Sequence, residues 1–168
     1  AACNAFQQAA GVLEALMAEV AQAAWTNLGK DLTKDALDML RTLMLAQAQK
    51  CFYEKATRSG MKDGIVAKIA AECAGLYADA STRLGHSKIK PPADWIEVVE
   101  WNKKAFDGMQ HYYAATGHEE AHEYGKQVSR LTYATNRAAE AVIMCKKAPK
   151  ELQEQFLNHH TLANEKRA

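Results

Sequence analysis

The fold class of this chain is decided by residues 43–80, LMLAQAQKCFYEKATRSGMKDGIVAKIAAECAGLYADA. On both sides of RSGMKDG, apolar residues recur three and four positions apart, which is the spacing of one face of an α-helix. Between them, two glycines and a cluster of charged residues interrupt the pattern, as is typical of a tight turn. This stretch therefore predicts two antiparallel helices joined near Gly60.

The same periodicity extends along the rest of the chain. Helix-forming residues dominate, only three prolines occur, and β-branched runs with period two are absent. Thr33 is a candidate N-cap, Gly29 and Gly117 are candidate breaks between helices, and Pro149 suits the first turn of a helix. We therefore expect an all-α fold in which antiparallel helix pairs form a tetratricopeptide-like solenoid core. The expected helices are about 2–26, 34–58, 62–84, 93–115, 118–147 and 149–166.

Length and composition limit the function classes. The chain has 168 residues, enough for one domain, and a formal net charge of +1, which provides no strong attraction to nucleic acid or anionic lipid. Its four cysteines are widely spaced without a C-x-x-C pair, which excludes a zinc ribbon and favours reduced thiols in a cytosolic protein. The chain does not start with Met, so it is expected to be an internal piece of a longer protein. No cofactor is expected.

A possible zinc site lies in HEEAHEYG, residues 118–125, which contains the pattern H-E-x-x-H. On one helical face, His118 and His122 would bind the metal and Glu119 would activate a water molecule. The histidine that the extended motif places three residues after its glycine is missing. Glu140, the nearest downstream replacement, would lie about 27 Å along the same helix from His122. A solvated helix start is therefore the main interpretation, and a zinc hydrolase is the alternative.

A more specific resemblance lies in the opening stretch. It is similar to the central helical hairpin of the Bro domain, found in endosomal adaptors of the Alix family. FQQAAG at 6–11 and YGKQVSRL at 124–131 resemble segments before and after that hairpin. A Bro domain is longer than this chain, so residues 1–168 are expected to form a single helical domain that is a fragment of it. The matching residues of the hairpin are Met44–Gln49, Phe52, Lys55–Arg58, Met61–Asp63 and Ala67–Lys68.

The resemblance implies a non-enzymatic binding module. Bro domains hold the amphipathic C-terminal helix of an ESCRT-III filament subunit in a hydrophobic groove, and their apolar contact positions match Phe52, Ile65 and Ile69. Ile65 and Ile69 are one helical turn apart, and Phe52 and Ile69 are nearly equidistant from Gly60, so the three can meet across a hairpin. Phe and Ile at helical spacing are also common core residues, so burial in the core is the alternative.

The resemblance also implies the surroundings of this site. Lys55 and Lys68 are expected to form a polar rim that pairs with acidic residues of the ligand helix. Such a module would be cytoplasmic and recruited to endosomal membranes through its partners, with no nucleic acid bound. A generic helical scaffold for another peptide is a further alternative.

Overall fold

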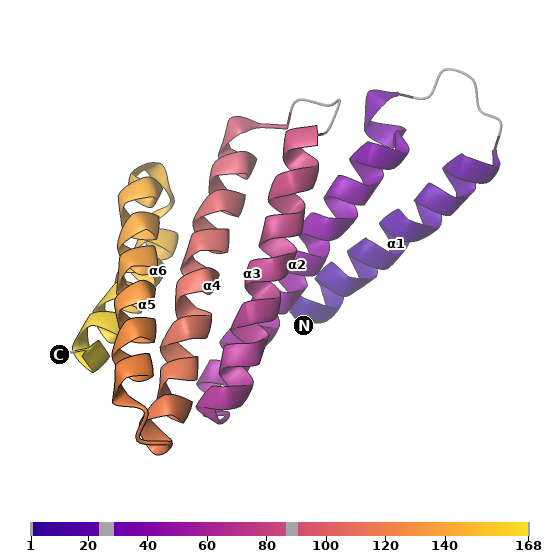
Figure 1. Cartoon of the computed structure of the whole chain (residues 1–168). Helices are drawn as coiled ribbons and strands as arrows, with labels where there is room; N and C mark the ends of the chain where they lie inside the picture. Colours follow the sequence, from indigo (N-terminus) through magenta and orange to yellow (C-terminus); the bar gives the residue numbers. More distant parts are fainter. Residues whose placement is uncertain (1, 24–28, 87–90, 168) are drawn as a thin grey trace.

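The computed structural model describes residues 2–23, 29–86 and 91–167 of the chain. Over these ranges it contains six α-helices and no strand, which confirms the all-α prediction. Two short 3-10 helices, Lys30–Leu32 and Cys145–Lys147, precede α2 and α6. The α-helices are α1 Ala2–Gln22, α2 Lys34–Arg58, α3 Asp63–His86, α4 Ala93–Glu120, α5 Tyr124–Met144 and α6 Lys150–Arg167 (Figure 1).

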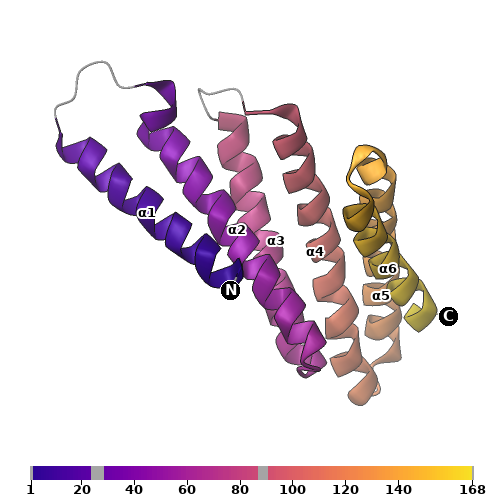
Figure 2. The same cartoon turned by 180° about the vertical axis from the view of Figure 1, so that it is seen from behind.

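The helices form a row in which each packs mainly against the next along the chain, and neighbours run antiparallel (Figures 1 and 2). The last helix, α6, folds back so that it also contacts α4. This arrangement of stacked helical hairpins is the predicted solenoid core. The α2–α3 and α4–α5 connections lie on the same side of the row, at the bottom of Figure 1.

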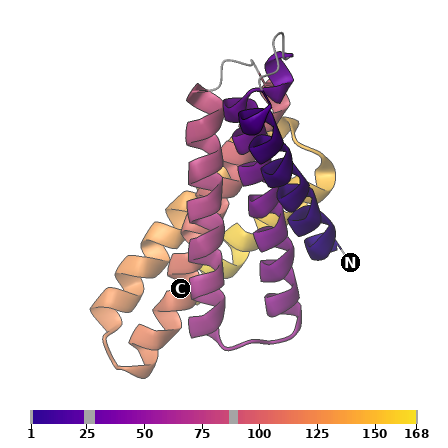
Figure 3. The ribbon, with the colours of Figure 1, turned by 90° about the vertical axis from the view of Figure 1, so that its right-hand side faces the viewer.

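The α2–α3 hairpin is built as its sequence predicts. Thr33 caps α2, since its side-chain oxygen accepts a hydrogen bond from the backbone N–H of Ala36 at 3.4 Å. At the other end Gly60 has φ of +65°, a left-handed conformation that glycine adopts without a steric penalty. The N–H groups of Gly60 and Met61 donate to the carbonyls of Thr57 and Ala56, which closes α2 with a Schellman motif. Figure 3 shows the hairpin with this turn at its lower end.

An aromatic core holds the hairpin against α4. Phe106 of α4 is fully buried, and its ring meets Tyr53 of α2 edge-on at 5.0 Å between centroids. On α3, the Tyr77 ring stacks on Phe106 at 5.9 Å. Val66 and Met109 are buried in the same cluster. Because α2, α3 and α4 each contribute large side chains to one cluster, the hairpin has a fixed position in the row.

A second cluster joins α4 to the last two helices. It contains Trp101 of α4, Cys145 after α5 and Phe156 of α6. Nearby, α4 and α5 approach closely at Gly108: a Cβ there would lie 3.2 Å from the Ala134 carbonyl oxygen. The absence of a side chain at Gly108 therefore sets the distance between these two helices.

The predicted boundary between the fourth and fifth helices is wrong. Helix α4 does not end before Gly117 but continues to Glu120, and the chain then turns at 121–123 before α5 begins at Tyr124. The N–H of Ala121 donates to the Gly117 carbonyl, so the helical pattern passes through the glycine. The turn itself contains His122 with φ of +57°, an uncommon conformation for a residue with a side chain.

The other predicted helices agree with the structure to within a few residues at each end. Residues 24–26 of the first predicted helix lie outside the described residues. The helix predicted at 118–147 ends at Met144 and is followed by a 3-10 turn, which is a common way for an α-helix to finish.

Candidate functional site

The three predicted contact residues lie on adjacent helices, and they differ in exposure. Phe52 of α2 is 39% exposed and Ile65 of α3 is 49% exposed, which is high for large apolar side chains on a packed hairpin. Ile69, one turn after Ile65, is only 8% exposed and belongs to the core cluster. The core alternative therefore describes Ile69, whereas Phe52 and Ile65 are open to a partner.

Sequence reasoning missed one exposed apolar residue of the same hairpin. Met61, directly after Gly60 in the α2–α3 turn, is also exposed. Its position after a glycine in a turn was the available signal, because a large apolar residue at the tip of a hairpin has little core to enter. We define the hairpin patch as Phe52, Met61 and Ile65.

Three lysines of the same hairpin have exposed side chains. Lys55, Lys62 and Lys68 are exposed, and within the described residues no ion pair includes any of them. By contrast, Arg58 on the same hairpin pairs with Glu54 at 3.2 Å. The lysine side chains are therefore available to acidic groups on a ligand.

A groove shares Ile65 with the hairpin patch. It lies between the start of α3 and the end of α4, has a volume of about 760 Å³, and includes Ile65 and Lys68 in its lining. Two acidic residues, Asp63 and Glu120, line this groove. Asp63 accepts a hydrogen bond from the Thr116 hydroxyl at 2.6 Å and lies 3.7 Å from the Lys166 ammonium group. Within the described residues Glu120 forms no ion pair, so its charge remains available beside Lys62 and Lys68.

Buried titratable groups of α2, α3 and α6 are held in their neutral forms. Burial raises the pKa of the Cys73 thiol to about 12 and also raises the pKa of Tyr53. Burial lowers the pKa of His159 to about 4, and the nearby ammonium group of Lys50 lowers it further. At neutral pH these side chains are uncharged, so they act in packing and do not present a thiolate or an imidazolium to a ligand.

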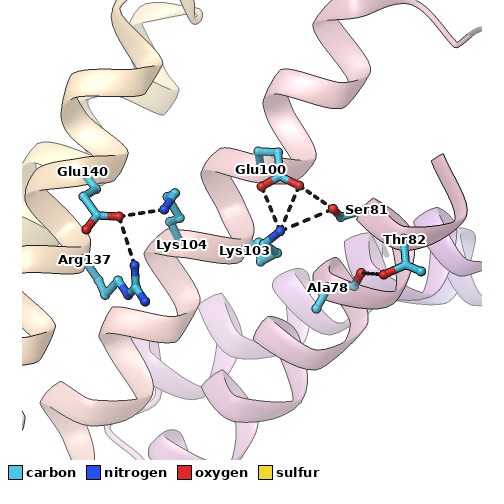
Figure 4. Close-up of polar contacts among 8 residues, drawn as sticks. All are labelled: Ala78, Ser81, Thr82, Glu100, Lys103, Lys104, Arg137 and Glu140. Atoms are coloured by element: carbon cyan, nitrogen blue, oxygen red, sulfur yellow. Dashed lines mark hydrogen bonds and ion pairs between the residues drawn. The ribbon is translucent and has the colours of Figure 1, made fainter. Parts of the chain in front are cut away.

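Polar contacts across the row fix α3, α4 and α5 relative to one another (Figure 4). Lys104 of α4 pairs with Glu140 of α5 at 2.6 Å, and Lys103 pairs with Glu100 at 2.8 Å. The Ser81 hydroxyl of α3 also donates to Glu100. Burial raises the pKa of Glu100, but the hydrogen bonds from Lys103 and Ser81 outweigh this effect and lower it overall. These pairs support the site from a distance and do not line it.

The histidines of HEEAHEYG are not arranged as the zinc motif requires. His118 lies in the last turn of α4 and His122 in the following turn, so the two do not share a helical face. Both ring nitrogens of His118 are occupied: Nδ1 lies 2.7 Å from a Glu123 carboxylate oxygen, and Nε2 accepts from Arg130 at 2.9 Å. Across the described ranges, no group of three or more His, Cys, Asp or Glu side chains is placed to hold a metal ion.

Comparison with known proteins places the chain in a family. A family model described as the BRO1-like domain matches residues 1–168. The chain belongs to this family. The predicted resemblance to the Bro domain is thereby confirmed. Among the described helices, none is both long and apolar enough to cross a membrane.

Curated relatives of this BRO1-like chain are much longer proteins. It is 34% identical over 156 residues to "ALG-2 interacting protein X" of Dictyostelium discoideum. The aligned region covers 91% of this chain and 20% of the relative. It is 31% identical over 150 residues to "Vacuolar protein-sorting protein bro-1" of Neurospora crassa. This aligned region covers 88% of this chain and 14% of the relative. The chain therefore spans about a fifth or less of these relatives.

A solved structure shares the fold. The "ALIX BRO1 CHMP4C complex" superposes with a TM-score of 0.82 at 24% identity, covering 97% of this chain and 46% of that chain. This likeness confirms that the row of helices is the arrangement found in a BRO1 domain.

Proposed function

We propose that this chain is part of an adaptor of the ESCRT pathway and holds the amphipathic C-terminal helix of an ESCRT-III filament subunit on the hairpin patch. The observation that carries the proposal is the exposure of Phe52 and Ile65 on a hairpin whose other large apolar residues are mostly buried. The relative named for vacuolar protein sorting and the ALIX BRO1 complex with CHMP4C support it.

The physical basis is helix-in-groove recognition. A ligand helix would lay its apolar i, i+3, i+4 and i+7 stripe on Phe52 and Ile65. Ile69 lies one turn further along α3 and is packed in the core, so its role is to hold α3, and with it Ile65, in position. Lys55 and Lys68 would pair with acidic residues of the ligand, which favours one orientation of the helix more than it adds affinity.

We further propose that residues 1–168 form one helical domain within a longer BRO1 domain. The module would be non-enzymatic and cytoplasmic, and it would reach endosomal membranes through its partners.

The test is binding of a fluorescein-labelled peptide that contains an ESCRT-III C-terminal helix, measured by fluorescence anisotropy. Phe52→Asp and Ile65→Asp should each abolish measurable binding, because a charge would replace a desolvated anchor worth about 2 kcal/mol or more. Val12→Asp is the matched control, since Val12 is also apolar and 68% exposed but lies on α1. It should bind as the wild type does.

Circular dichroism separates a binding defect from unfolding. Both patch variants should keep the helical signal and melting temperature of the wild type, because the substituted side chains are substantially exposed. Undiminished binding in the two variants would refute the patch as the ligand site. A collapsed helical signal in both would show instead that they are core residues.

A further inference from the structure

The tip of the α4–α5 hairpin, residues 117–126, carries an exposed tyrosine that the proposed function does not use. Tyr124 is 59% exposed and is the first residue of α5. Its hydroxyl lies 3.1 Å from Nδ1 of His122, which is itself exposed. The Tyr124 side chain therefore lies largely in solvent.

The other tyrosines are far less available. Tyr53 and Tyr77 are buried in the aromatic core, and Tyr112 and Tyr113 are partly buried on α4. Tyr133 is more exposed, but its hydroxyl donates to Asp107 at 2.8 Å and accepts from Arg137 at 2.9 Å. Tyr124 is thus the most exposed of the six tyrosines.

The charged residues shortly before Tyr124 are acidic, whereas Lys126, two residues after it, pairs with Glu123 at 2.6 Å. Glu119, Glu120 and Glu123 precede it within five residues. Glu119 and Glu120 are exposed, and within the described part of the chain no ion pair includes either of them. Protein kinases select substrates in part by such charge patterns. The acidic side chains would favour a tyrosine kinase with a basic substrate-binding cleft.

The segment around Tyr124 can also open at low cost. Residues 121–126 are mostly exposed, so unwinding them uncovers little apolar surface. Gly125 follows the tyrosine, and glycine is unfavourable in a helix by about 1 kcal/mol relative to alanine. His122 already has an uncommon positive φ. The first turn of α5 can therefore extend into an enzyme cleft while the rest of the hairpin stays packed.

We propose that Tyr124 is a phosphorylation site for a tyrosine kinase that recognises acidic residues ahead of its target. In the reaction the phenol oxygen bonds to the γ-phosphorus of ATP, the bond from that phosphorus to the β–γ bridging oxygen breaks, and ADP leaves. The phenolic proton passes to the catalytic base of the kinase. The products are ADP and the phosphotyrosine monoester.

The product suits its position in the fold. Helix α5 has no acidic residue in its first turn, and the Glu123 side chain makes no capping hydrogen bond. A phosphate group of charge about −1.5 to −2 at Tyr124 would add negative charge near the positive end of the helix dipole. The exposed phosphotyrosine would then be available to a domain that binds it through a cluster of arginines.

The test uses the folded chain, ATP and a purified tyrosine kinase verified on a generic acidic tyrosine peptide, with sites mapped by mass spectrometry. We expect one phosphate, on Tyr124. Tyr124→Phe should lose it, whereas the matched variant Tyr133→Phe should be phosphorylated at the wild-type rate. Replacing both Glu119 and Glu120 by lysine should slow the reaction severalfold without changing the helical signal.

A synthetic peptide of residues 116–128 completes the design. Phosphorylation of the peptide but not of the folded chain would overturn the proposal, because the fold would then block the site. Absence of phosphate in both would overturn recognition of the acidic sequence. Phosphate mainly on another tyrosine of the folded chain would overturn the assignment to Tyr124.

Discussion

The contrast between Ile65 and Ile69 gives a quantitative prediction, because these residues lie one turn apart on α3. Ile69 is 8% exposed and packed in the core, so Ile69→Ala should destabilise the fold by about 2–5 kcal/mol through lost burial and a cavity. Ile65 is 49% exposed. Ile65→Ala should therefore lower the free energy of unfolding by less than about 1 kcal/mol, since about half of the side chain is already in water. In a chain of this size, 1 kcal/mol shifts the melting temperature by about 2–4 °C.

The assay combines urea denaturation, followed by circular dichroism, with peptide binding by fluorescence anisotropy. Ile69→Ala should lose stability and, where still folded, bind nearly normally. Ile65→Ala should keep its stability and bind about 30-fold more weakly, the equivalent of a 2 kcal/mol anchor. Equal losses of stability in the two variants would refute the division into a core residue and a contact residue. Weaker binding in Ile69→Ala than in Ile65→Ala would refute it as well.

Two further predictions concern stability. The folded-state pKa of His159 is lowered to about 4, so between pH 6.5 and 4 the unfolded chain binds a proton that the folded chain does not. The contribution of His159 to stability should therefore be fully present above pH 6.5 and should fall by about 2 kcal/mol by pH 5. Urea denaturation midpoints at the two pH values should show a smaller fall in His159→Gln than in the wild type. An equal fall would assign the effect to other groups. Gly60→Ala should lower the free energy of unfolding by about 1–2 kcal/mol in the same assay, because φ is +65°. No neighbouring atom lies within 4 Å of the added Cβ, so no steric clash adds to this cost. An unchanged free energy of unfolding would show that the turn relaxes.

The α4–α5 connection shows where sequence reasoning failed. Gly117 was interpreted as a break because glycine is a poor helix former, but a single glycine is tolerated inside a long helix when tertiary contacts hold it. Phe106 and Met109 anchor α4 in the core, and the helix continues past Gly117 to Glu120. The turn then falls on His122, whose positive φ no local rule would have predicted. The zinc alternative depended on this boundary, because H-E-x-x-H needs both histidines on one helix.

The sequence alone determined the helices and the α2–α3 hairpin, since helical periodicity, the Thr33 cap and the Gly60 turn are local properties. It also indicated the family, because the residues of the hairpin match a specific pattern. Only the tertiary structure decided which apolar residues face outward. Residues four apart on a helix differ by about 40° around its axis, and that rotation places Ile65 at the solvent and Ile69 in the core. Which side of that boundary a residue occupies depends on where the neighbouring helices pack, and helical periodicity alone does not determine this.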